Sequence, residues 1–170
     1  MDTNKSAACA ADDAEQEILE FIIAGSSFGV NLGQIAELVQ KQVPQPIPNF
    51  HPCIEGVVNP RGKTYALVDL AKYFNLSASS SPDKDIYIIS RLNKDALCFH
   101  VHKAEGIHRL NSQKIPKPAD LLNGAGEGVI TGIIEAEGRI IAVVDFEKIA
   151  ADLRGYFTLL PEDEPLTTAN

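Results

Sequence analysis

Two short motifs in this chain have the residue types of catalytic or phosphate-binding sites. Gly25-Ser26-Ser27-Phe28-Gly29 matches the G-x-S-x-G pattern of a hydrolase nucleophile, which requires a strand before the serine and a helix after it. An apolar, β-like segment follows instead, so Ser26 is expected in a hairpin turn. Gly62-Lys63-Thr64 resembles the end of a phosphate-binding loop, but Val57 stands where that motif needs glycine. We expect neither acyl transfer nor phosphate binding.

Three histidines in the second half of the chain could converge on a metal ion. His100 and His102 would face the same side of a strand, and His108 could lie on a neighbouring strand. Three imidazoles can bind zinc. No glutamate or cysteine stands at a recognisable metal spacing, so polar side chains on a solvated face are favoured. We assign no catalytic residue, metal ligand or cofactor and predict no enzyme; a ligand- or metal-binding β-barrel module using these histidines stays open as the alternative hypothesis.

Residues 54–70 are the most informative stretch of the sequence. Two apolar runs flank Asn59-Pro60-Arg61-Gly62. Pro60 fixes φ and lacks an N–H donor, so a central strand cannot pass through it. Gly62 can adopt the positive φ that such a turn often requires. We predict that Arg61 is displayed on a stiff turn between two strands, where its planar guanidinium suits recognition of another protein.

The composition is that of an acidic globular protein, with 45% hydrophobic and 22% charged residues. The net charge is −8 and no dense Lys/Arg run occurs, so neither nucleic acid nor an anionic membrane surface is an expected partner. Cys9, Cys53 and Cys98 lack close spacing, which predicts reduced thiols. The N-terminus has no apolar signal-peptide core, and no apolar run could span a bilayer. We therefore expect a cytoplasmic protein without membrane insertion.

The pattern within residues 15–157 is mainly that of short β-strands, and residues 1–14 and 158–170 are expected to be flexible tails. Residues 19–23 and 28–32 flank a turn and predict a hairpin. The proline-rich stretch 44–60 is expected to be an extended crossing without regular structure. Further strands are expected at 63–69, 86–90, 97–101, 106–110, 129–135 and 139–145.

Few helices are expected. Residues 34–40 place Ile35, Leu38 and Val39 on one helical face, residues 146–153 form an amphipathic C-terminal helix, and residues 70–74 make one turn. Residues 124–128 are Gly-rich and predict a surface loop, and no internal repeat is apparent. Closely spaced strands without long alternating helices favour β-barrels or a sandwich.

The order of several segments gives the chain a family resemblance. Phe28-Gly29-Val30-Asn31-Leu32 is followed by Ile35-Ala36-Glu37-Leu38, by the proline-rich stretch, by Gly56-Val57-Val58-Asn59-Pro60-Arg61-Gly62 and by Val68-Asp69-Leu70. Over residues 17–153 the chain resembles the CheW-like coupling domain of bacterial chemotaxis. The second half looks closer to CheV proteins, which join this domain to a phosphorylatable receiver. About a dozen residues, 158–170, follow the predicted domain, so receiver-linked control is not carried over.

The resemblance implies a mainly β fold: two packed five-stranded SH3/OB-like β-barrel lobes with a few short helices and a C-terminal helix. It also implies a scaffold in two-component chemotaxis signalling, acting through protein–protein binding. The cytoplasmic tip of a methyl-accepting chemoreceptor would dock in a hydrophobic groove between the lobes. A separate face would bind the regulatory domain of a CheA-type histidine kinase.

Four receptor-side residues are implied by position in the family pattern. Ile35 would supply apolar contact, Glu37 a charge partner, and Gly56 a close backbone approach. Arg61 would bridge the lobes or contact the partner. One residue departs from the pattern, because Pro60 stands where the family usually has leucine. The change removes a backbone donor and an apolar side chain, and is expected to weaken or re-aim a contact at this turn.

Overall fold

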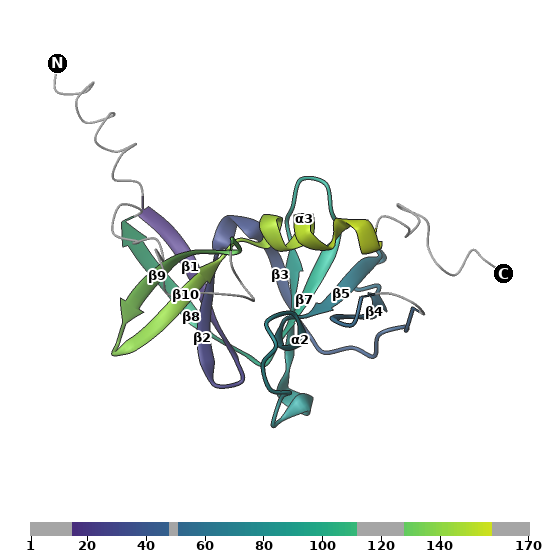
Figure 1. Ribbon diagram of the computed structural model, residues 1–170, viewed down its shortest axis with the longest axis horizontal. Coiled ribbons are helices and arrows are strands. Elements are labelled where there is room, and N and C mark those ends of the chain that lie inside the picture. The colour runs from purple at the N-terminus through teal and green to yellow at the C-terminus, as the bar shows by residue number, and fades with distance from the viewer. Residues whose placement is uncertain (1–14, 48–50, 112–127, 158–170) are drawn as a thin grey trace, which may run out of the picture.

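The computed structural model describes residues 15–47, 51–111 and 128–157. Within them, ten strands form two five-stranded sheets (Figure 1). The predicted tails and most of the Gly-rich loop lie outside these residues. Lobe 1 contains β1 (Glu15–Ile23), β2 (Ser26–Asn31), β8 (Lys103–Asn111), β9 (Ile130–Ala136) and β10 (Arg139–Val144). Lobe 2 contains β3 (Ile35–Gln40), β4 (Ile54–Val58), β5 (Tyr65–Asp69), β6 (Ile86–Ser90) and β7 (Leu97–Val101).

The prediction of two five-stranded β lobes is confirmed. The strand order is β8-β1-β2-β10-β9 in lobe 1 and β3-β6-β7-β5-β4 in lobe 2. No ladder joins the edge strands of either sheet among the described residues, but in lobe 2 a single bridge pairs Gln45, after β3, with Val57 of β4. Each sheet therefore curls without a continuous ladder around a barrel.

The two lobes share one folding scheme in circularly permuted order, although no repeat was apparent in the sequence. Lobe 2 runs through three strands, helix α2 (Leu70–Tyr73) and two more strands. Lobe 1 runs through β8, β9, β10 and helix α3 (Phe146–Phe157), and its last two strands, β1 and β2, come from the start of the chain. The third and fifth strands pair in parallel in both lobes, β5 with β7 and β10 with β2.

A similar turn begins both helices. Each follows a Val-Asp pair at the end of a strand, and the aspartate side chain accepts hydrogen bonds from the first backbone N–H groups of the helix. Asp69 Oδ1 accepts from Ala71 N at 2.9 Å, and Asp145 Oδ1 accepts from Glu147 N at 2.9 Å. These caps explain why the predicted single turn and the C-terminal helix start where they do.

The helix predicted over residues 34–40 is wrong. A short 3-10 turn, Leu32–Gln34, begins at Asn31, whose side chain accepts a hydrogen bond from Gly33 N at 2.8 Å, and the chain then enters β3. Pairing with β6 decides the outcome, because Ile35, Leu38 and Val39 fit both a helical face and a bulged strand. The irregular crossing predicted over 44–60 is also corrected, since β4 lies within it.

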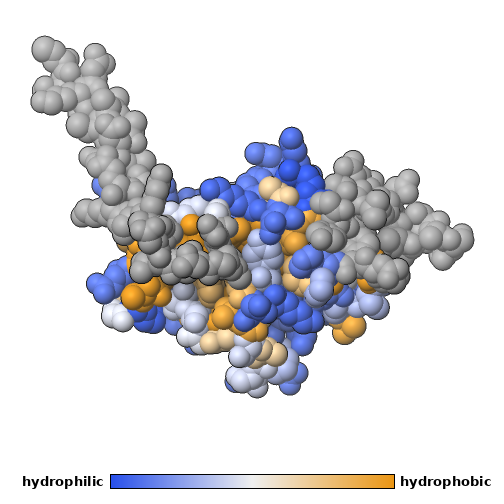
Figure 2. Space-filling view, viewed as in Figure 1, coloured by the Kyte–Doolittle hydropathy of each residue, from blue (hydrophilic) through white to orange (hydrophobic). Residues whose placement is uncertain are grey.

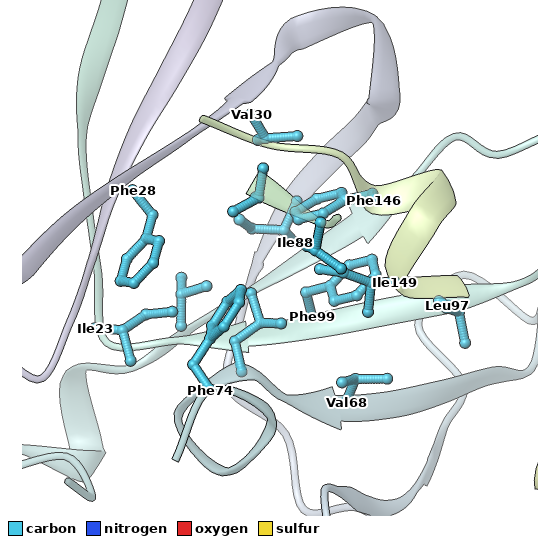
Figure 3. Close-up of a cluster of buried hydrophobic side chains, with 14 of the residues drawn as sticks. Ile23, Phe28, Val30, Val68, Phe74, Ile88, Leu97, Phe99, Phe146 and Ile149 are labelled. Atoms are coloured by element: carbon cyan, nitrogen blue, oxygen red, sulfur yellow. The ribbon is translucent and has the colours of Figure 1, made fainter. Parts of the chain in front are cut away.

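An aromatic core joins the two lobes (Figure 3). Phe28 of lobe 1 stacks on Phe74, just after α2, with ring centroids 5.1 Å apart. Phe146 of α3 stacks on Phe99 of lobe 2 at 4.0 Å. Helix α3 thus follows β10 of lobe 1 and packs on lobe 2 (Figure 1), where Arg154 pairs with Asp95 at 2.8 Å. This shared core makes the lobes one structural unit and fixes the surfaces that they present together.

Candidate functional site

The turn between β4 and β5 displays Arg61 as predicted. Pro60 is buried and anchors the turn, while the Arg61 side chain is 70% exposed. Arg61 has φ 73° and Gly62 has φ 79°, so a left-handed conformation falls on the arginine as well as on the glycine. This conformation costs a non-glycine residue about 1–2 kcal/mol. An exposed side chain held on a strained turn is typical of a functional site.

Arg61 forms an ion pair with Glu37 of β3. The guanidinium donates from Nε to Glu37 Oε1 at 3.2 Å and from Nη2 to Glu37 Oε2. Because β3 and β4 are the opposite edges of the lobe 2 sheet, this pair spans the open seam of one lobe rather than bridging two lobes. The hydrogen bond to Glu37 raises the pKa of Arg61 above its ordinary value, so the cation is permanent. A pair this exposed contributes little to stability and is available to a partner.

Gly56 lets two backbone segments of the chain itself approach closely. Gln45, on the crossing after β3, exchanges two 2.8 Å backbone hydrogen bonds with Val57 of β4. Gly56 has φ 149°, and a Cβ atom placed there would lie 2.2 Å from the Gln45 carbonyl oxygen. The close approach expected at Gly56 therefore serves the closure of lobe 2, and any approach of a partner's backbone stays a prediction.

The four predicted receptor-side residues divide into two kinds. Ile35 is 8% exposed and packs in the shared core, and Gly56 is buried as well. Only Glu37 and Arg61 of the four reach the surface with a side chain. The Ile35 side chain packs against the shared core, and an apolar contact from it to a partner stays a prediction.

A groove between the lobes has a volume of about 510 Å³. Its walls are mainly apolar and come from β2, β9 and β10 on one side and from the segment after α2 on the other. None of Ile35, Glu37, Gly56 and Arg61 lines it. Figure 2 shows apolar side chains reaching the surface in several separate groups. The lining residues are Gly25, Ser26, Ser27, Phe28, Phe74, Leu76, Ile130, Arg139, Ile140 and Ala142.

The three histidines do not converge, so the metal cluster of the alternative hypothesis is not formed. The favoured interpretation, a solvated face, is wrong for His100, which is 8% exposed. His108 lies on β8 in lobe 1 and forms a 2.8 Å hydrogen bond with Glu20. His102 follows β7 and accepts a hydrogen bond through Nδ1 from Ala24 N at 3.0 Å. His100 lies on β7, between Glu55 and Asp85. The spacing suggested one face, but the chain leaves lobe 2 between His102 and His108.

Glu20 is a fully buried charge at the centre of lobe 1. Arg139 donates to it from Nε at 3.0 Å and from Nη2 at 2.8 Å, and His108 provides the third contact. The hydrogen bonds from Arg139 favour the ionised carboxylate by more than burial disfavours it, and they lower the pKa of Glu20 to about 2. This network ties β1, β8 and β10 together. No sequence pattern indicated this network, because the three residues are far apart along the chain.

Two of the three cysteines are inert thiols. Cys53 and Cys98 are buried and unbonded, and burial raises the pKa of each thiol to about 12. Neither cysteine forms a disulfide within the described residues, and Cys9 lies outside them. The reduced state of the thiols stays a prediction. A thiol that stays protonated is a poor nucleophile and a poor metal ligand.

Comparison with known proteins decides the family. The model of the CheW-like domain matches residues 17–154 of the chain. The chain belongs to the CheW-like domain family. Its members are adaptors rather than enzymes, as expected here. None of the helices within the described residues is long and apolar enough to cross a membrane.

Individual CheW-like relatives agree with this assignment. The chain is 27% identical to the chemotaxis protein CheW of Thermotoga maritima over 82% of this chain and 90% of that one. It is 26% identical to the chemotaxis protein CheV3 of Helicobacter pylori, of which it spans about half. These two identities do not favour CheV over CheW. The scaffolding protein TtCheW of Thermoanaerobacter tengcongensis has the same fold, with a TM-score of 0.69 and 21% identity over 76% of this chain and 88% of that one.

Substitution of Gly56 tests the close contact that closes lobe 2. Gly56→Ala is expected to lower the free energy of unfolding by about 3 kcal/mol, because the new Cβ meets the Gln45 carbonyl and the backbone keeps a positive φ. Chemical denaturation measures the loss. Gly106→Ala is the control, since a Cβ there meets nothing within 4 Å, and it should change stability by less than about 1 kcal/mol. Equal effects of the two variants would contradict the closure role.

Stability as a function of pH tests the buried carboxylate. A lowered carboxyl pKa stabilises the fold above the ordinary value of 4.5, and this contribution is lost as the pH falls toward 2. At about 1.4 kcal/mol per pKa unit, it reaches up to about 3 kcal/mol. The stability difference between the wild type and Glu20→Gln should therefore shrink between pH 4.5 and pH 2 in denaturation series. Glu17→Gln, which removes an exposed pair with Arg109, is the control. A difference that stays constant over this window would overturn the assignment.

Proposed function

We propose that this chain is a cytoplasmic adaptor that couples the cytoplasmic tip of a chemoreceptor to the regulatory domain of a CheA-type histidine kinase. It acts by binding both partners and carries out no chemistry itself. Membership of the CheW-like family over residues 17–154 supports a coupling role in chemotaxis. The name of the TtCheW neighbour, a scaffolding protein, points the same way.

The exposed position of Arg61 is the observation that supports receptor binding. Its turn is strained, its side chain is 70% exposed, and its guanidinium already forms two hydrogen bonds with the carboxylate of Glu37. A fixed fork of this kind binds carboxylates in a bidentate manner. We expect an acidic side chain of the receptor tip to bind Arg61, either beside Glu37 or in its place.

The groove between the lobes offers the apolar part of the receptor contact. Its walls include Phe28, Phe74 and Ile140, and Ile140 is 67% exposed. A few well-placed apolar and arginine anchors suffice for reversible binding. Arg61 does not line the groove. The receptor tip would therefore contact both Arg61 and the groove, or only one of them.

Binding measurements with purified partners test the proposal. Wild-type chain is expected to bind both a receptor cytoplasmic tip and the kinase regulatory domain, as measured by calorimetry. Arg61→Ala should weaken receptor binding at least about tenfold and leave kinase binding and thermal stability unchanged, because the exposed pair adds little to the fold.

Arg109→Ala is a matched control for the loss of an exposed cation. Its side chain is 71% exposed, against 70% for Arg61, and it also pairs with a glutamate, Glu17. It should bind the receptor tip as the wild type does. Failure of the wild-type chain to bind either partner would reject the adaptor function. Equal weakening by both arginine variants would show a general charge effect and reject the specific role of Arg61.

A further inference from the structure

Three carboxylates surround His100 inside lobe 2. Its Nδ1 lies 2.5 Å from Glu55 Oε2 on β4, and its Nε2 lies 2.6 Å from Asp85 Oδ2, just before β6. Asp69, at the end of β5, faces the same space. One donor atom from each of Glu55, Asp69 and His100 lies within 4.8 Å of the others. Four segments distant in the sequence thus bring nitrogen and oxygen donors to one point.

Within the described residues, His100 is the only cationic partner of these three carboxylates, and it pairs with Glu55 and Asp85. Lysine and arginine side chains pair with six other acidic residues in the described part of the chain, but none pairs with these three carboxylates. Even with a protonated His100, the local charge is −2. The Asp85 side chain is 1% exposed and that of Glu55 is 21% exposed, so water screens this charge poorly. Buried charge of this kind is normally paired or bound to a metal ion.

We propose that Glu55, Asp69 and His100 form a binding site for a divalent transition-metal ion such as Zn²⁺. His100 would bind through Nδ1, and its Nε2–H would donate to Asp85, which orients the imidazole as carboxylates do in histidine metal sites. A mixed nitrogen and oxygen donor set suits Zn²⁺ or Mn²⁺ better than Ca²⁺ or Mg²⁺. Three protein ligands leave a fourth position for water.

The local geometry permits the small rearrangement that binding requires. Two ligands of a tetrahedral zinc ion lie about 3.3 Å apart, so Glu55 Oε2 must withdraw slightly from His100 Nδ1. The partly exposed Glu55 side chain has room to do so. Asp69 caps α2 through Oδ1 alone, which leaves Oδ2 for the ion. A bound ion would fasten β4, and with it the base of the Arg61 turn, to β5 and β7.

Metal titration of the full chain tests the site, after treatment with a chelator. Calorimetry with Zn²⁺ is expected to show one ion bound per chain, with a rise in the melting temperature that Mg²⁺ does not produce. Asp69→Asn and Glu55→Gln should each weaken Zn²⁺ binding at least about tenfold, and Asp85→Asn by about 10- to 100-fold. Asparagine can still cap α2, so Asp69→Asn removes a ligand without removing the cap. Circular dichroism checks that each variant is folded.

The other histidines supply matched controls. His102→Gln and His108→Gln should bind Zn²⁺ as the wild type does, because neither imidazole belongs to the site. No Zn²⁺ binding by the wild type would overturn the proposal. Unchanged binding in Asp69→Asn and Glu55→Gln, or loss of binding in either histidine control, would also overturn it by placing the ion elsewhere.

Discussion

The close approach of the chain to itself at Gly56 is the constraint on which the candidate site depends. The crossing after β3 can pair with β4 only because Gly56 has no Cβ atom where the Gln45 carbonyl lies. That pairing brings the opposite edges of the lobe 2 sheet together, so that Glu37 on β3 reaches Arg61 on the β4–β5 turn. Strand β4 also contains Glu55, which contacts His100. One glycine thereby sets the position of a surface cation and of a buried charge cluster.

Most of the fold could be predicted because its strands are short, regular and separated by clear turn residues. The strands at Ile86–Ser90 and Leu97–Val101 have the predicted bounds, and Gly25 and Gly138 mark hairpin turns with positive φ. β3 was missed because the spacing of its apolar residues fits two structures, and only long-range pairing with β6 decides between them. The common, permuted strand order of the two lobes was also hidden, since it is a property of the backbone pairing and no internal repeat was apparent in the sequence.

The candidate site was predictable only where it is local. Pro60 and Gly62 indicated a turn that displays Arg61, but the left-handed conformation of Arg61 itself and its ion pair with Glu37 depend on how lobe 2 curls. The histidine spacing suggested one cluster, whereas tertiary structure divides the three between different partners. The carboxylates around His100 come from separate segments, so no local spacing could have predicted them. Long-range contacts form the charge clusters around Glu20 and around His100. Such contacts produce no periodic pattern in the sequence.

A bridging measurement tests whether this chain couples the two partners. Receptor tips are immobilised, and retention of the kinase regulatory domain is measured with and without the chain. We expect retention that depends on the wild-type chain and is lost with Arg61→Ala, although that variant still binds the kinase domain in solution. Retention without the chain, or equal retention with wild type and Arg61→Ala, would show that the kinase domain is not held through Arg61 of this chain.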